Sequence, residues 1–193
     1  MEITQTLYVS TAKEWRQWLA ENHRTAKDIW LMYPLKASGK QRIPYGDAVD
    51  EALCFGWIDS TAKRLDAETS LQRYSPRRKN SVLSEMNKER MRRLIAAGKM
   101  TNAGLDSVKH HILNYSEGMT NISFGEFIFP ADILGELQKD PEVWKNYNSF
   151  PQYYQRIRIA YIEEYRNAPE IFQRRMDYFV KKTKQNKRFG LIQ

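Results

Sequence analysis

The chain of 193 residues is poor in cysteine and histidine, with one of the former and three of the latter. The single cysteine, Cys54, cannot form an internal disulfide, which fits a reducing compartment. His110 and His111 are adjacent, so on a helix they face different ways and do not form a joint metal site. We therefore expect a protein that holds neither a metal ion nor a cofactor.

Long apolar runs are also lacking. No stretch approaches the roughly 18 consecutive apolar residues that a membrane helix needs. The first residues, MEITQTLYVSTAKEW, have neither the basic start nor the apolar segment of a secretion signal. We therefore expect a cytoplasmic protein that does not insert into a membrane.

Short catalytic motifs are absent as well. The sequence has no P-loop, no dinucleotide-binding glycine pattern, no zinc-ligand spacing and no serine-nucleophile elbow. This excludes the enzyme classes that such motifs identify, while enzymes without a short signature remain open.

Basic residues exceed acidic ones, and the formal net charge is +8. Residues 62–93 hold ten Lys or Arg against four Asp or Glu, and residues 170–193 hold seven against two. Basic surfaces of this kind attract phosphates, nucleic acid or anionic lipid. The alternative is that two basic helices are simply solvated.

Local patterns in the first half predict a sheet covered by helices. Thr11 and Glu14 have the capping-box spacing of a helix start. Residues 45–55 predict a second helix, with Gly56 in its C-terminal turn because glycine reaches positive φ without steric cost. Three short β-prone stretches predict strands, at residues 29–35, 57–63 and 71–75. The predicted fold class is α+β, with a small antiparallel sheet of about three strands covered by helices.

Further helices are predicted beyond the sheet. Ser84 is a good N-cap for a helix that ends at Gly98, and residues 101–113 predict another. In the C-terminal part the helix signals are Asp140 before Pro141, a capping box from Ser149 to Gln152, and Ala168 before Pro169. We predict an α+β domain at residues 1–117, a linker at 118–129, and a helical unit with a basic tail at 130–193.

Opposite charges, aromatic residues and a tight turn converge between Tyr45 and Arg78. Glu51 lies one helical turn before Cys54, Asp59 follows the turn at Gly56, and the hairpin is expected to return Arg73 and Arg77 toward these acids. Arginines offer paired donors to a phosphate or carboxylate, and either acid could act as a general base. An ion-pair network that only fixes the fold is the competing interpretation.

The turn from Ser75 to Ser81 adds basic residues directly before a helix start, a natural environment for an anion. Cys54 is a further candidate nucleophile, although a free cysteine is commonly a buried apolar residue. The candidate catalytic residues are Glu51 and Asp59, and the candidate ligand-binding residues are Arg73, Arg77, Arg78, Trp57, Tyr74 and Ser81.

Two parts of the chain resemble a known family. AVDEALCFGWIDS (residues 48–60) and the SPRR turn (75–78) resemble the YdeI/OmpD-associated family. DPEVW (140–144), PQYY (151–154) and YIEEYRNAPE (161–170) resemble its bacteriocin-protection region. The resemblance covers roughly residues 11–117 and 130–190. In the family pattern a tryptophan precedes the serine, whereas in this chain Leu83 precedes Ser84. An aromatic wall is therefore not expected at position 83.

The resemblance implies a bacterial cytoplasmic protein associated with protection against bacteriocins or antimicrobial peptides, or with a porin, and it implies no catalytic mechanism. The leading hypothesis is a non-catalytic stress or defence protein that binds an anionic small molecule or a protein partner at an arginine-rich cleft. The alternatives are an enzyme acting on a small phosphorylated or carboxylated metabolite, and a weak nucleic-acid binder that uses the basic C-terminal helix. Nucleic acid could also use the charge of the turn from Ser75 to Ser81, with Tyr74 and Trp57 as stacking surfaces.

Overall fold

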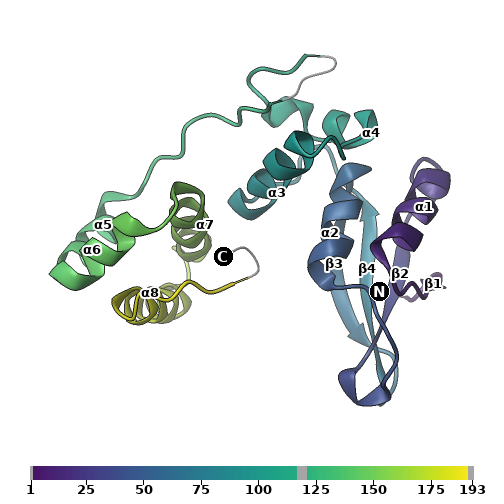
Figure 1. Cartoon of the computed structure of the whole chain (residues 1–193), viewed down its shortest axis with the longest axis horizontal. Coiled ribbons are helices and arrows are strands. Elements are labelled where there is room, and N and C mark those ends of the chain that lie inside the picture. Colours follow the sequence, from purple (N-terminus) through teal and green to yellow (C-terminus); the bar gives the residue numbers. More distant parts are fainter. Residues whose placement is uncertain (1, 117–120, 191–193) are drawn as a thin grey trace. The chain divides into compact units, whose positions relative to one another are not determined.

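The computed structural model describes residues 2–116 and 121–190, apart from the side chain of Lys36, and the chain divides into two compact units (Figure 1). The first unit holds the chain up to Leu83 and from Arg90 to Phe124, and the second holds Ser84–Glu89 and the chain from Gly125 on. The elements before the second group of helices are β1 (Thr6–Leu7), α1 (Ala12–Asn22), β2 (Ile29–Pro34), η1 (Lys36–Ser38), α2 (Tyr45–Cys54), β3 (Trp57–Arg64), β4 (Thr69–Pro76), α3 (Glu85–Ala96), α4 (Asn102–Asp106) and η2 (Lys109–His111).

The strands form one mixed sheet in the order β1-β2-β4-β3. Strands β2 and β3 both pair antiparallel with β4, while β1 pairs parallel with β2 through Thr6 opposite Trp30 and Leu7 opposite Leu31. The α+β fold class is therefore confirmed, but the described residues form four strands where about three were predicted. Strand β1 was missed because two residues are too few to show an alternating pattern.

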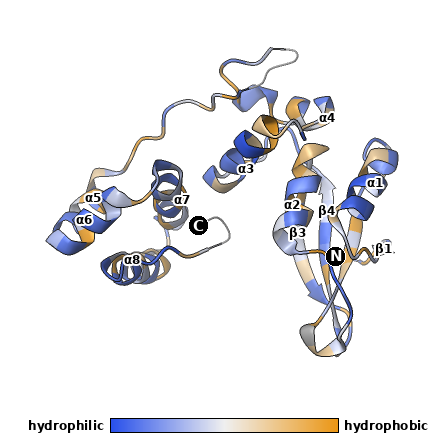
Figure 2. Ribbon diagram, in the orientation of Figure 1, coloured by the Kyte–Doolittle hydropathy of each residue, from blue (hydrophilic) through white to orange (hydrophobic). Residues whose placement is uncertain are grey.

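Helices α1 and α2 pack against one face of the sheet around a large apolar core. The indole nitrogen of Trp15 donates a hydrogen bond to the carbonyl oxygen of Ala48 at 3.0 Å, which ties α1 to α2. The Trp15 ring also lies 5.4 Å from the ring of Tyr74 on β4. Figure 2 shows hydrophobic and hydrophilic residues on each of these helices, as expected for amphipathic helices with one buried side.

Several predicted local signals are confirmed. The Thr11 side chain and the Glu14 side chain cap each other's backbone amides at the start of α1. Gly56 has a φ of 75° directly after α2, a left-handed conformation that glycine adopts without steric cost. The Ser84 hydroxyl accepts a hydrogen bond from the Asn87 amide at the start of α3.

The helix predicted over residues 101–113 is wrong in its extent. Helix α4 ends at Asp106, and a 3-10 turn follows at Lys109–His111. The chain leaves helical geometry at Val108, whose φ of −127° and ψ of 7° accompany burial of its side chain in the first core. Tertiary burial therefore overrides the local helical pattern here.

Part of the predicted linker, residues 118–120, lies outside the described residues. Residues 121–129 form neither helix nor strand. Ile122 belongs to the core of the first unit, whereas Phe127 and Phe129 pack against the core of the second. This segment is therefore anchored at both ends by apolar side chains.

The second unit is helical and has its own core. Its helices are α5 (Ala131–Gln138), α6 (Pro141–Ser149), α7 (Gln152–Glu163) and α8 (Pro169–Lys184). The Asp140 carboxylate accepts hydrogen bonds from two amides at the start of α6, so the predicted cap is confirmed. The predicted capping box at Ser149 is wrong, because Ser149 ends α6 and its hydroxyl donates a hydrogen bond to the carbonyl oxygen of Asn146, while Pro151 is the N-cap of α7.

Across residues 2–116 and 121–190, no helix combines the length and the apolar character needed to cross a bilayer.

Candidate functional site

The predicted acid of α2, Glu51, pairs with a residue that the sequence interpretation did not consider. Its carboxylate accepts a hydrogen bond from Arg16 on α1 at 2.7 Å, and its side chain is largely buried. Burial opposes the charge of Arg16, but the hydrogen bonds and attraction of Glu51 and Cys54 outweigh it and raise the arginine's pKa. Glu51 is therefore held in a structural ion pair between two helices.

Cys54 is not placed as a nucleophile. Its side chain is fully buried, and burial raises the pKa of its thiol to about 11, despite a hydrogen bond from Arg16. The thiolate is the reactive form of cysteine, so at neutral pH this group stays protonated. It packs as a small apolar residue of the first core.

Arg73 also has a different partner from the one predicted. It pairs with Asp28 at 2.6 Å, and its Nη1 lies 3.4 Å from the hydroxyl groups of Ser60 and Ser75. Successive side chains of a strand point to opposite faces, so Arg73 lies on the face of β4 opposite to Tyr74. The predicted pairing of Arg73 with the acids at positions 51 and 59 is therefore wrong.

Trp57 and Tyr74 are both buried in the first core, at 1% and 0% exposure, so neither offers a ring to a ligand from solvent. The Trp57 indole donates to the carbonyl oxygen of His23 at 3.2 Å. The hydroxyl groups of Tyr74 and Tyr33 lie 3.2 Å apart. These contacts explain the two aromatic residues as core groups whose polar atoms are satisfied.

Asp59 accepts a hydrogen bond from the hydroxyl of Tyr45 at 2.6 Å. Tyr33 and Tyr45 line a small cavity of about 250 Å³ at the end of the sheet, together with the exposed Arg42. Burial, followed by the hydrogen bond to Asp59, raises the pKa of Tyr45, which keeps its proton on the phenol. This arrangement holds Asp59 as a hydrogen-bond acceptor.

Arg77 is the buried member of the predicted basic turn, with 8% exposure. Its Nη2 donates to the carbonyl oxygen of Val82, whereas its Nε and Nη1 have no hydrogen-bond partner among the described residues. Burial lowers the pKa of Arg77. Arg78 is exposed, and the hydroxyl of Ser81 donates to its carbonyl oxygen at 2.8 Å.

Between described residues, no hydrogen bond or ion pair connects Arg73 or Arg77 to Glu51 or Asp59. The single cleft expected from the sequence is thus replaced by separate local contacts. The role of Arg77, Arg78 and Ser81 as ligand groups stays a prediction.

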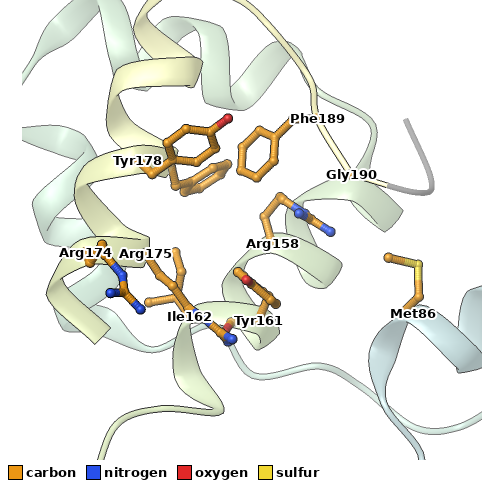
Figure 3. A pocket seen from close by; sticks show the side chains of 10 residues that line it. Met86, Arg158, Tyr161, Ile162, Arg174, Arg175, Tyr178, Phe189 and Gly190 are labelled. Carbon is orange, nitrogen blue, oxygen red and sulfur yellow. The ribbon is translucent and has the colours of Figure 1, made fainter. Parts of the chain in front are cut away.

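A larger cavity lies in the second unit, where the sequence interpretation placed no site (Figure 3). Its volume is about 550 Å³, within the range of small-molecule sites. Helices α7 and α8 and the segment after α8 supply most of its lining. The principal side chains are Arg158, Tyr161, Ile162, Arg174, Arg175, Tyr178, Phe179 and Phe189.

Arg158 of α7 is the most unusual of these side chains. It is 5% exposed, and its guanidinium carbon lies 4.9 Å from the ring centre of Phe189 and 5.5 Å from that of Tyr161. The guanidinium makes no hydrogen bond or ion pair with the residues described, and its Nε is buried without a partner. Burial lowers the pKa of Arg158, and no carboxylate of the described residues offsets the loss of solvent.

Arg175 of α8 differs from Arg158 in having partners. Its guanidinium carbon lies 3.5 Å from the ring centre of Tyr161 and 3.8 Å from that of Tyr165. It also donates to the carbonyl oxygen of Tyr161 and pairs with Glu164 at 3.3 Å. Arg175 is therefore part of the wall, while the Arg158 guanidinium has no hydrogen bond or ion pair among the described residues.

The sequence carried a usable signal for this site. Tyr154, Arg158 and Tyr161 are spaced by four and three residues, which places them on one side of α7, and Tyr165 follows four residues later in the turn after the helix. An arginine within an aromatic stripe departs from the usual apolar composition of such a face.

Among the residues that the structure describes, no three His, Cys, Asp or Glu side chains gather as metal ligands would.

Comparison with known proteins gives two family matches. Residues 126–186 match the model described as "Bacteriocin-protection, YdeI or OmpD-Associated", which confirms the predicted resemblance for this part of the chain. Residues 7–107 match a separate model, described as "Domain of unknown function (DUF8412)". No curated protein and no solved structure matches the chain. Because residues 7–107 are more than half of the 193 residues, the chain belongs to the family described as Domain of unknown function (DUF8412), and it carries a YdeI/OmpD-associated domain at residues 126–186.

Proposed function

We propose that the protein is a non-catalytic binding protein whose second unit takes up an anionic small molecule at the Arg158 pocket. One observation carries this proposal. As a residue Arg158 is 5% exposed and lines a cavity of about 550 Å³, and its guanidinium has neither a hydrogen bond nor an ion pair within the described residues.

A buried cation destabilises a fold unless an anion or hydrogen-bond acceptors accompany it. The surrounding rings offset part of this through cation–π attraction. A carboxylate or phosphate entering the pocket would add charge-assisted hydrogen bonds to the fixed fork of the guanidinium.

The contacts of the predicted catalytic groups support the non-catalytic part of the proposal. Glu51 is engaged by Arg16, and the thiol of Cys54 is buried with a raised pKa. Asp59 is engaged by the hydroxyl of Tyr45. None of these groups is among the residues that line the Arg158 pocket.

We also propose that this binding serves a stress or defence role in the bacterial cytoplasm. The support is the description of the family that residues 126–186 match, which names bacteriocin protection. The test is survival under bacteriocin challenge of a deletion strain complemented with the natural chain or with Arg158→Met. Equal survival with the natural chain and with Arg158→Met would show that the pocket is not needed for protection.

Binding is tested with the full chain and four anionic probes: inorganic phosphate, acetate, benzoate and phenyl phosphate. Ligands that bind the folded state raise its melting temperature, so we expect at least one probe to do so, and Arg158→Met to abolish the shift. Lys181→Met is the matched control, because it removes an exposed cation from α8 that does not line the pocket. The absence of any Arg158-dependent shift would overturn the proposal. Salt-sensitive binding of an oligonucleotide by the Arg158→Met variant would favour a nucleic-acid binder instead.

A further inference from the structure

The Arg158 pocket offers a ligand both a charge and an apolar wall. Tyr161 and Tyr178 are 43% and 47% exposed, and one face of the Tyr161 ring is covered by Arg175. Phe189 meets Tyr178 edge to face, with ring centres 4.9 Å apart. Figure 3 shows Arg158 lying between Phe189 and Tyr161, so the charged group lies next to open ring surface.

The backbone after α8 limits the position of the Arg158 guanidinium. Gly190 has a φ of 98°, and a Cβ at this position would lie 2.9 Å from Nη1 of Arg158. The Phe189 amide donates to the hydroxyl of Tyr154 at 3.0 Å, which holds this segment against α7. The guanidinium is therefore confined between the Phe189–Gly190 backbone and the ring of Tyr161.

The positive charge available to a ligand inside the pocket is small. Arg175 is already paired with Glu164 and stacked on two tyrosines. Arg174 is exposed on α8 and has no hydrogen bond or ion pair within residues 2–116 and 121–190, so it can only add charge at the rim. A ligand in the pocket thus meets one buried guanidinium rather than a cluster of free cations.

We propose that the ligand is an amphipathic anion, with one carboxylate or phosphate head on Arg158 and an apolar ring or acyl body against Tyr161, Tyr178 and Phe189. This inference rests on the proposed function and specifies its ligand class. A small inorganic anion would leave the aromatic wall in water. A neutral apolar ligand would leave the buried charge of Arg158 unpaired.

Four probes separate these cases in calorimetric titrations of the full chain. 2-Naphthoate and octanoate carry a head and a body, 2-naphthamide carries the same body without the charge, and acetate carries the head alone. We expect either amphipathic anion to bind at least about tenfold more tightly than both 2-naphthamide and acetate, a difference of about 1.4 kcal/mol. The relative affinity of 2-naphthoate and octanoate shows whether the natural body is a ring or an acyl chain.

Two variants assign the binding energy to the two parts of the pocket. Arg158→Met should bring 2-naphthoate down to the affinity of 2-naphthamide. Tyr178→Ser should weaken 2-naphthoate and leave acetate unchanged, because Tyr178 offers a ring and is already half exposed. Circular dichroism of each variant verifies that it folds, and Lys181→Met again controls for net charge.

The possible failures are distinguishable. If acetate or inorganic phosphate binds as tightly as 2-naphthoate and needs Arg158, the ligand class is wrong while anion binding at the pocket stands. If 2-naphthamide equals 2-naphthoate in the natural chain, the head-on-Arg158 arrangement is wrong. If no anion binds in an Arg158-dependent manner, both the inference and the proposed function fail.

Discussion

The Arg16 guanidinium on α1 and the Glu51 carboxylate on α2 form an ion pair of 2.7 Å between the two helices that cover the sheet. Arg16 also donates to the carbonyl oxygen of Lys99 and lies over the ring of Phe55. One side chain thus connects α1, the end of α2 and the turn after α3. Glu51 was a candidate catalytic acid in the sequence, but its contacts are those of a structural ion pair.

Glu51→Gln should destabilise the first unit. The substitution removes the charge from a largely buried hydrogen-bonded pair, and hydrogen bonds to charged groups contribute about 1.5–3 kcal/mol each. We expect the free energy of unfolding to fall by an amount in that range, measured by urea denaturation followed by tryptophan fluorescence.

A double-mutant cycle with Arg16→Met isolates the pair. Residues that interact directly show a coupling energy of at least about 0.5 kcal/mol, whereas independent sites are additive. Additive effects of the two substitutions would mean that Glu51 is not stabilised by Arg16, and would reopen its assignment as a functional acid.

The sequence predicted local features well where they depend on neighbouring residues. The capping pair Thr11 and Glu14, the left-handed Gly56 and the capping Asp140 all follow from short-range chemistry, and each is confirmed. The Ser149 capping box failed because the same residue also fits the last turn of α6. Spacing alone does not decide between two such positions.

The partners of charged residues could not be predicted in the same way. Glu51 pairs with a residue 35 positions away, and Arg73 with one 45 positions away, so their partners depend on how helices and strands pack. The proximity of acids and arginines in the sequence suggested pairs that the alternation of β4 prevents. Arg158 was overlooked because an arginine within a helix stripe is unusual only when it lacks a hydrogen-bonding partner, and the sequence does not show this.

Gly104→Ala should destabilise the first unit through a steric clash. A Cβ at position 104 would lie 2.8 Å from the carbonyl oxygen of Leu53, a backbone atom at the end of α2 that cannot easily move. Overpacking of this kind costs about 1–3 kcal/mol. Gly46→Ala is the matched control, because its Cβ would meet only the side chain of Arg90 at 3.8 Å. Equal stability of the two variants in urea denaturation would contradict the close packing of α4 on α2.

The stability of the first unit should fall at alkaline pH, in part through Cys54. Burial raises the pKa of its thiol from 9.0 to about 11, so above pH 9 the folded state keeps a proton that the unfolded state loses. The free energy of unfolding therefore decreases as pH rises from about 9 to 11, and this contribution is fully retained below pH 9. Cys54→Ala should make the decrease shallower in that interval, measured by urea denaturation at several pH values. An unchanged slope would show that the thiol titrates alike in both states.

Arg158→Met should stabilise the second unit while abolishing ligand binding. Methionine retains much of the aliphatic volume and removes a buried charge that has no anionic partner among the described residues. Replacing buried charged groups by apolar ones often stabilises a fold, by about 1–4 kcal/mol; we expect the lower end, because cation–π contacts with the surrounding rings are lost. Arg166→Met is the control, because Arg166 is exposed and pairs with Asp132, so no stabilisation is expected there.

The measurement is the melting temperature of each ligand-free protein in thermal unfolding. A lower melting temperature for Arg158→Met would identify Arg158 as a structural group held by its rings, whereas a higher one would indicate a charge retained at the expense of stability, as a binding site requires.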